Sequence, residues 1–110
     1  LGLNTPGTAV WNRARVEGII DFRDAVETAA RYVPELISLG TDLVVVVAHT
    51  GLDGGSSYAG DLAAEENFGK RLAETVEGID HIILGHHHRL IDGLKITGPD
   101  GRDVSLVMSG

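Results

Sequence analysis

The feature that most constrains the fold is a short apolar run that ends in a glycine and three histidines. Residues 82–84 are Ile, Ile and Leu, and Gly85-His86-His87-His88 follows them directly. Branched apolar residues favour a buried strand, and a glycine at its end lets the backbone turn sharply and come close to a ligand. We therefore predict a strand that delivers imidazole side chains at its carboxyl end.

A second apolar run has the same construction and precedes His49. Residues 43–48 are Leu, four Val and Ala. Because the run is apolar at every position, we predict a central parallel strand over residues 42–48 that is buried on both faces. Sheets of α/β proteins bind ligands beyond the carboxyl ends of such strands, so strands that end in histidine predict a metal site at that edge.

Helical spacing of apolar residues predicts the elements around these strands. A helix is expected that starts at Asp21 followed by Asp24 and ends at Gly40, with a kink or two abutting helices at Pro34. A second helix is expected over residues 61–78, with Asp61 as its cap. The segment 50–60, rich in glycine and serine, is expected to form a mobile loop over the site.

Shorter patterns complete the predicted fold. Residues 1–3 are expected to end a strand, residues 16–22 could form a short strand, and a hairpin is predicted around the turn at residues 98–101. The order strand, loop, helix, strand predicts a right-handed crossover, which would place His49 and Gly85 at the same edge. The fold class is α/β, with parallel central strands, flanking helices and a C-terminal β-hairpin.

Composition excludes several classes of function. Nine basic and sixteen acidic residues give a net charge of −7, which argues against binding of nucleic-acid polymers or of an anionic membrane surface. A phosphorylated substrate would need a cation to reverse this field locally. The absence of cysteine excludes disulfides and thiolate metal sites, and no apolar run is long enough to span a bilayer.

The histidines are the candidate metal ligands. Extended backbone projects alternate side chains to one side, so His86 and His88 are expected to converge, with His87 facing away or towards substrate. With His49 they could bind one catalytic zinc ion or belong to a two-metal site. An exposed histidine turn without a ligand is the alternative. His81 begins its strand at the opposite edge, which indicates a structural or surface residue.

Other chemically capable side chains carry weaker signals. Asp53 and Asp61 are interpreted as solvated acids of the loop after the first strand. Glu65 and Glu66 are expected in the first turn of the second helix, where carboxylates are favourable because of the helix dipole alone. Trp11 is interpreted as core or loop packing rather than as a platform for base stacking.

Four stretches follow the motif order of one enzyme family. They are Ala48-His49-Thr50-Gly51, Glu66-Asn67, residues 76–80 and Gly85-His86-His87-His88. In that order they resemble the H-x-G, E-N, G-I-D and G-H-x-H motifs of the calcineurin-like metallophosphoesterases, in the branch of bacterial 5′-nucleotidases and 2′,3′-cyclic-nucleotide phosphodiesterases. Residues 5–24 and 107–110 also resemble this branch, so the resemblance covers nearly the whole chain.

The resemblance implies the α/β sandwich of this family and a two-metal site. His49 and His86 would ligate one divalent ion, and His88 the other. The ions, which could be zinc, manganese or iron, would flank a phosphate, activate water for in-line attack and supply positive charge. No residue is assigned as catalytic. The residues expected close to substrate are His87, Thr50, Gly51 and Asn67.

The resemblance is incomplete at both ends of the chain. The D-x-H, G-D-x-x-D and G-N-H motifs of the family do not occur in residues 1–110, nor does a substrate-binding domain. We therefore expect the C-terminal half of a metallophosphoesterase catalytic domain, inactive when isolated. A half-sheet has an open edge, so it is expected to bind the remainder of its own domain or to self-associate.

The predicted function is metal-dependent hydrolysis of nucleotide phosphoesters, and family resemblance alone implies a secreted or periplasmic location. One alternative is a non-catalytic α/β module that binds metal or phosphate. The other is a structural half-domain whose histidines have no chemical role.

Overall fold

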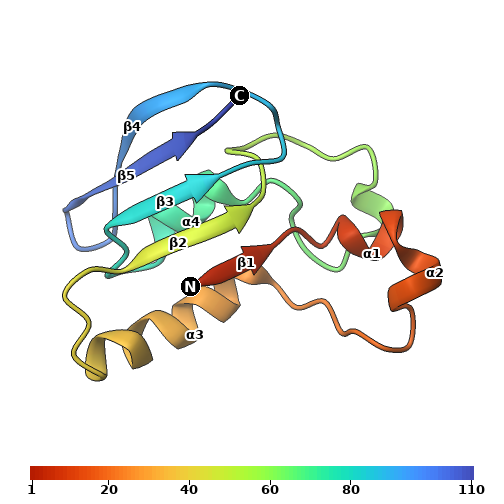
Figure 1. Cartoon of the computed structure of the whole chain (residues 1–110), viewed down its shortest axis with the longest axis horizontal. Coiled ribbons are helices and arrows are strands. Elements are labelled where there is room, and N and C mark those ends of the chain that lie inside the picture. The colour runs from red at the N-terminus through yellow and green to blue at the C-terminus, as the bar shows by residue number, and fades with distance from the viewer.

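Five strands form one mixed sheet in the computed structural model, which describes residues 1–110 (Figure 1). The strands are β1 (Gly2–Asn4), β2 (Val45–His49), β3 (His81–Leu84), β4 (Ile91–Thr97) and β5 (Asp103–Met108). Their order across the sheet is β1-β2-β3-β5-β4. Every neighbouring pair is parallel except β4 and β5, which form an antiparallel hairpin. The predicted α/β class, crossover and C-terminal hairpin are therefore confirmed.

The helices are short apart from one. They are α1 (Thr8–Trp11), α2 (Arg13–Val16), α3 (Ala25–Ser38), a 3-10 turn η1 (Ala59–Asp61) and α4 (Gly69–Thr75). The α4 helix lies in the crossover from β2 to β3, and it packs against α3 and β3 (Figure 1). None of these helices has the length and apolar character needed to cross a membrane.

The hydrophobic core lies on one face of the sheet. Residues of α3 and α4 join alternate residues of β2, β3 and β5 in one cluster of 17 buried side chains. In β2, Val46 is fully buried whereas Val47 is 55% exposed, and in β3 Ile82 is fully buried whereas Ile83 is 39% exposed. The prediction that residues 42–48 are buried on both faces is therefore wrong, because the helices cover only one of them.

The second helix is much shorter than the predicted range 61–78. Asp61 ends the 3-10 turn η1 and caps no helix, and α4 begins only at Gly69. The reason is a competing set of hydrogen bonds. The buried hydroxyl of Thr50 accepts from the Phe68 amide and donates to the Glu66 carbonyl, and these bonds hold the backbone before α4 in an irregular path.

The strand considered for residues 16–22 is absent. The helical turn α2 ends at Val16, and the amides of Ile19 and Ile20 both donate to the Val16 carbonyl. Gly18 has a φ of 73°, which turns the chain in a conformation that favours glycine. Ile19 and Ile20 are 79% and 54% exposed, so these two apolar residues do not belong to a strand of the sheet.

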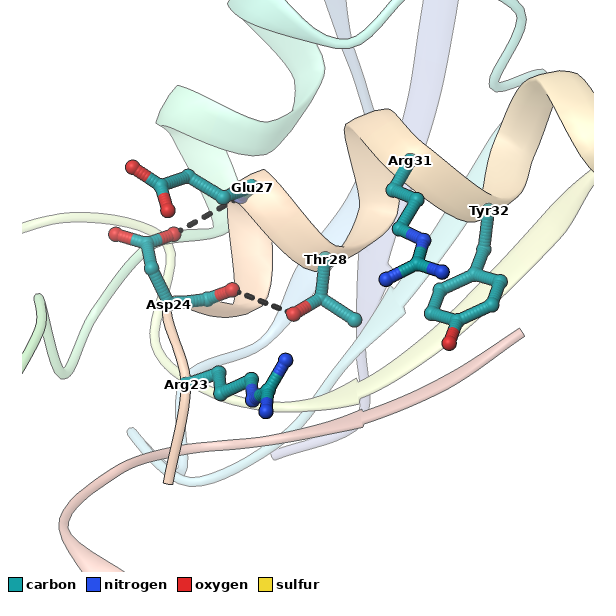
Figure 2. A pocket seen from close by; sticks show the side chains of 6 residues that line it. All are labelled: Arg23, Asp24, Glu27, Thr28, Arg31 and Tyr32. Carbon is teal, nitrogen blue, oxygen red and sulfur yellow. Dashed lines mark hydrogen bonds between the residues drawn. The ribbon is translucent and has the colours of Figure 1, made fainter. Parts of the chain in front are cut away.

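Asp24 connects the two helices that cover the core. Its carboxylate caps α3 by accepting from the amides of Val26 and Glu27, and its carbonyl accepts from Thr28 (Figure 2). The same carboxylate accepts from Arg71 of α4 at 2.6 and 2.5 Å. The helix then continues through Pro34 as a single element, so the predicted alternative of two abutting helices is wrong.

The pKa of Asp24 reflects these contacts. Burial raises the pKa of the carboxyl, but the hydrogen bond from Arg71, the amides of Glu27 and Val26, and the charge of Arg71 together hold it below its ordinary value of 3.8. A lowered folded-state pKa stabilises the fold fully above the ordinary value, and the stabilisation is lost as the pH falls below it.

We expect Asp24→Ala to lower the free energy of unfolding by about 2 kcal/mol near neutral pH, because the change removes a helix cap and the closer of the two carboxylates that pair with Arg71, the other being Glu65. Urea denaturation measures this difference, which should shrink as the pH falls below 3.8. Asp21→Ala is the matched control, since the pair of Asp21 with Arg23 is exposed and should contribute below about 0.5 kcal/mol. Equal losses in the two variants would contradict this assignment.

Candidate active site

Two of the predicted histidines meet at the carboxyl edge of the parallel strands. His49 is the last residue of β2, and His86 follows β3 by two residues. Their ring centroids are 5.2 Å apart. The register that pairs Val45 with His81 places the ends of β2 and β3 side by side, so the crossover brings the rings together. His81 lies at the start of β3, at the opposite end of the strand, as predicted.

The backbone of the histidine turn is not extended. His86 has a φ of 71° and His88 a φ of 50°, both in the left-handed region. The prediction that alternation on extended backbone makes these two side chains converge is therefore wrong in its premise. His88 is exposed, and no group of three or more His, Cys, Asp or Glu side chains is arranged to hold a metal ion. Residues other than glycine rarely adopt such conformations, and those that do cluster at functional sites.

His87 packs inward instead of facing solvent. Its ring stacks on that of His86 with centroids 5.5 Å apart, and a side chain at Gly51 would overlap it. Burial, followed by the charges of Arg89 and His86, lowers the pKa of His87. Its Nδ1 atom is buried without a hydrogen-bond partner. The ring is therefore held neutral, with one polar atom unsatisfied.

A buried carboxylate contacts the histidine turn. Glu66 Oε1 lies 2.9 Å from His86 Nε2, and the Glu66 side chain is only 7% exposed. Its backbone carbonyl accepts from the hydroxyls of Thr50 and Thr5, which follow β2 and β1. Both hydroxyls are fully buried. The ends of two strands therefore fix the position of this carboxylate.

Glu66 determines which nitrogen of His86 can bind a ligand. An ionised carboxylate only accepts hydrogen bonds, so Nε2 of His86 must be the donor. In the neutral form of the ring, the lone pair then lies on Nδ1. Carboxylates orient metal-binding histidines in this manner. Sequence reasoning had explained Glu66 by the helix dipole, and that interpretation is wrong because no helix begins there; the E-N motif was the signal that pointed to it.

The remaining predicted residues take structural positions. Thr50 and Asn67 are buried, at 0% and 2% exposure. Asn67 donates to the Gly54 carbonyl at 3.2 Å, while its own side-chain oxygen is buried without a partner. Gly51 makes room for the His87 ring. These residues hold the loop after β2 around the histidine turn.

Aromatic rings border the same edge. Trp11 lies against His86 with ring centroids 5.2 Å apart and an interplanar angle of 31°, and Tyr58 meets Trp11 edge-on at 6.4 Å. Trp11 is 41% exposed. Of the two packing roles predicted for Trp11, packing in the core is wrong, because α1 carries the ring to the site instead of into the core. Packing against loops agrees with its contacts to Gly7 and Tyr58.

One surface cavity lies beside α3, and another lies beside the loop after β2. One of about 370 Å³ lies beside the start of α3 and contains none of the predicted site residues (Figure 2). Another, of about 450 Å³, is bordered by Glu66 and by residues of the loop, among them Gly54 and Ser56. Of these two cavities, only the second lies beside His86, through Glu66.

Comparison with solved structures identifies the class of protein. The fold matches the calcineurin-like phosphoesterase YfkN of Bacillus subtilis with a TM-score of 0.75 and 28% identity, over 99% of this chain and 34% of that one. It also matches the NAD nucleotidase NadN of Haemophilus influenzae with a TM-score of 0.73, at 21% identity, over 98% and 21% of the two chains. No family model matches. The chain is therefore a relative of the calcineurin-like phosphoesterases, as its motifs predicted.

Curated relatives narrow this class to one branch. The chain is 34% identical over 105 residues to the 2′,3′-cyclic-nucleotide 2′-phosphodiesterase/3′-nucleotidase of Salmonella typhimurium, covering 96% of this chain and 16% of the relative. It is 36% identical over 104 residues to the protein of the same name from Haemophilus influenzae, covering 94% and 15%. The resemblance to the nucleotide-hydrolysing branch is confirmed, over a segment that is a small part of each relative.

We expect Glu66→Ala to change the tautomer of His86, because the acceptor for its Nε2 proton is lost. Nitrogen chemical shifts of the ring measure this directly, and metal affinity should fall by about tenfold to a hundredfold. Glu66→Gln keeps an oxygen acceptor and should preserve the tautomer. Glu65→Ala is the control, since Glu65 pairs with Arg71 and not with a histidine. An unchanged His86 spectrum in Glu66→Ala would refute this role.

Proposed function

We propose that the chain forms part of the active site of a metal-dependent nucleotide phosphoesterase, acting on 2′,3′-cyclic nucleotides or nucleoside monophosphates. The proposal rests chiefly on the meeting of His49 and His86 at the carboxyl edge, with Glu66 fixing the second ring. The names of the relatives from Salmonella and Haemophilus support the nucleotide as substrate. The same relatives and motifs support a secreted or periplasmic location.

The residues present fit one end of a two-metal centre. His49 and the Nδ1 atom of His86 would hold one divalent ion, and His88 would take part in holding the second after a change in the histidine turn. Zinc, manganese and iron all accept imidazole ligands. Such ions, when bound, supply positive charge to a phosphate and lower the pKa of water. The chain's own part is to orient the imidazoles and to keep His87 neutral beside them.

The uncovered face of the sheet supports the need for further protein at this site. Val47 and Ile83 project from that face, and His49 continues the same alternation one step beyond Val47. A layer that covers these apolar side chains would therefore also lie beside His49. We propose that the rest of the catalytic domain forms this layer and contributes the missing ligands, and that the isolated chain is inactive or self-associates.

We expect hydrolysis of 2′,3′-cyclic AMP and 3′-AMP, with Mn²⁺ or Zn²⁺ supplied, to fall to background in His49→Ala, His86→Ala and His88→Ala. A chelator should have the same effect on the unchanged protein. His81→Ala is the matched control and should keep activity within about twofold, because this histidine lies at the far end of β3. The assay compares the chain alone with the chain combined with the rest of the catalytic domain.

Undiminished activity in His86→Ala would refute the proposal. The alternative of a non-catalytic metal-binding module rests on the same histidines and on the D-x-H, G-D-x-x-D and G-N-H motifs, which do not occur in residues 1–110. Titration of the isolated chain with Zn²⁺ separates the two, since stoichiometric tight binding by the chain alone, with no hydrolysis in the complete domain, would support the module.

A further inference from the structure

We infer that His87 is a positioning residue, whose ring packs on Gly51 and thereby holds the strained turn that presents His86. The inference rests on the proposed function only in its last step, where His86 acts as a metal ligand. It links the two histidine motifs through one contact, since Gly51 belongs to the first motif and His87 to the second. A small change in the loop after β2 would therefore alter the position of His86.

The backbone at His86 is strained. The His87 amide donates to the Gly85 carbonyl at 2.8 Å, and a bond that spans a single residue in this way defines a γ-turn with His86 at its centre. The φ of 71° places His86 in the rare and strained form of this turn, which glycine adopts more readily. His88 adds a second positive φ, of 50°. Strained backbone of this kind persists only where surrounding contacts hold it.

The His87 ring occupies the space that a side chain at residue 51 would need. A Cβ atom at Gly51 would overlap the Cε1, Nδ1 and Nε2 atoms of this ring. Gly51 is not among the residues with positive φ, so its backbone conformation would accept another residue. Glycine is therefore required at this position for space, because the His87 ring lies against its backbone.

The backbone under the His87 ring is itself fixed. The Gly51 carbonyl accepts from the Gly69 amide at 3.1 Å, and the Leu52 carbonyl accepts from the Lys70 amide at 2.6 Å. Both amides belong to the first turn of α4, whose buried side chains are part of the hydrophobic core. The ring therefore rests on backbone that is tied to the core through α4, and this backbone cannot easily move away from it.

The same ring contacts His86. The two rings are stacked, with centroids 5.5 Å apart and planes inclined at 25°. Glu66 Oε1 lies 2.9 Å from Nε2 of His86, and His49 meets the His86 ring edge-on. Glu66 therefore fixes one nitrogen of the His86 ring, and His87 fixes the plane in which the other nitrogen, Nδ1, lies. A metal ligand needs both, because its lone pair must point at the ion.

This role of His87 depends on the shape of the ring and not on its polar atoms. Its Nδ1 atom is buried without a hydrogen-bond partner, so this nitrogen contributes no bond that would hold the ring. An apolar ring of similar shape would remove the cost of an unsatisfied polar atom. His87→Phe should therefore keep the turn in place, whereas His87→Ala should release it. A direct polar role of His87 predicts the opposite result for His87→Phe, which would then fail as His87→Ala does.

Nuclear magnetic resonance of the complete catalytic domain without metal tests the turn. The nuclear Overhauser effect between the amide and Hα protons of His86 is strong at positive φ, because the two protons then lie close together. It should weaken in His87→Ala and stay strong in His87→Phe and in the control His81→Ala. The Kd for Zn²⁺ should rise about tenfold in His87→Ala alone. An unchanged effect at His86 in His87→Ala, or equal losses in His87→Ala and His87→Phe, would overturn the inference.

A double variant tests the contact between the two motifs. Gly51→Ala should weaken the same signal of His86, because the added Cβ atom displaces the His87 ring. Gly60→Ala is the matched control, since a Cβ atom there meets nothing within 4 Å. Gly51→Ala combined with His87→Ala should be no worse than His87→Ala alone, because the overlap is gone. If Gly51→Ala fails to fold and the double variant folds, the overlap is supported; additive losses, or equal failure of both to fold, would contradict it.

The spectra without metal separate this inference from the proposed function. If they change as expected but the complete domain hydrolyses no nucleotide, the proposed function fails and the positioning role of His87 stands. If hydrolysis depends on His86 but neither the spectra nor the rate change in His87→Ala, the positioning role fails and the proposed function stands. Where both hold, about tenfold more Mn²⁺ should restore hydrolysis in His87→Ala, because the variant weakens a ligand without removing it.

Discussion

The buried hydroxyl of Thr50 holds together the part of the chain on which the site depends. It donates to the Glu66 carbonyl at 2.7 Å and accepts from the Phe68 amide at 3.0 Å. A buried polar group that loses such partners costs about 1–3 kcal/mol, so the loop cannot easily leave this path. Because Thr50 follows β2 directly, one side chain links the edge of the sheet to the carboxylate that orients His86.

The one-sided sheet gives the site its second constraint. Helices α3 and α4 bury alternate residues of β2 and β3, while Val47 and Ile83 stay exposed on the opposite face. His49 follows the exposed alternation, whereas His86 lies beyond the strand in a left-handed turn. The two rings therefore approach one another from different elements, His49 from the end of strand β2 and His86 from the turn after β3. One additional layer of protein over the exposed face would therefore both cover Val47 and Ile83 and lie beside His49.

Local sequence patterns predicted the elements whose structure depends on residues that are close together in the chain. The apolar runs identified β2 and β3, and the turn around residues 98–101 identified the hairpin, since each signal lies within its element. The helix over residues 61–78 was predicted too long because a side chain 18 residues away binds the Phe68 amide. The contact of Glu66 with His86 spans 20 residues, and periodicity carries no information about such a pair. Motif resemblance singled out both residues without giving their contact.

The charges at the carboxyl edge limit how a phosphate could bind. The lowered pKa of His87 keeps that ring neutral, and Glu66 places negative charge at His86. Arg89 is the basic side chain whose charge reaches His87. A dianionic phosphate therefore needs either Arg89 or bound cations to offset the field of Glu66 and of the chain as a whole. An imidazole ligates a cation through the lone pair of its neutral form, and the carboxylate of Glu66 behind His86 would strengthen that ring as a ligand. The electrostatics of this edge thus favour a cation between the histidines and the phosphate over direct binding by the protein.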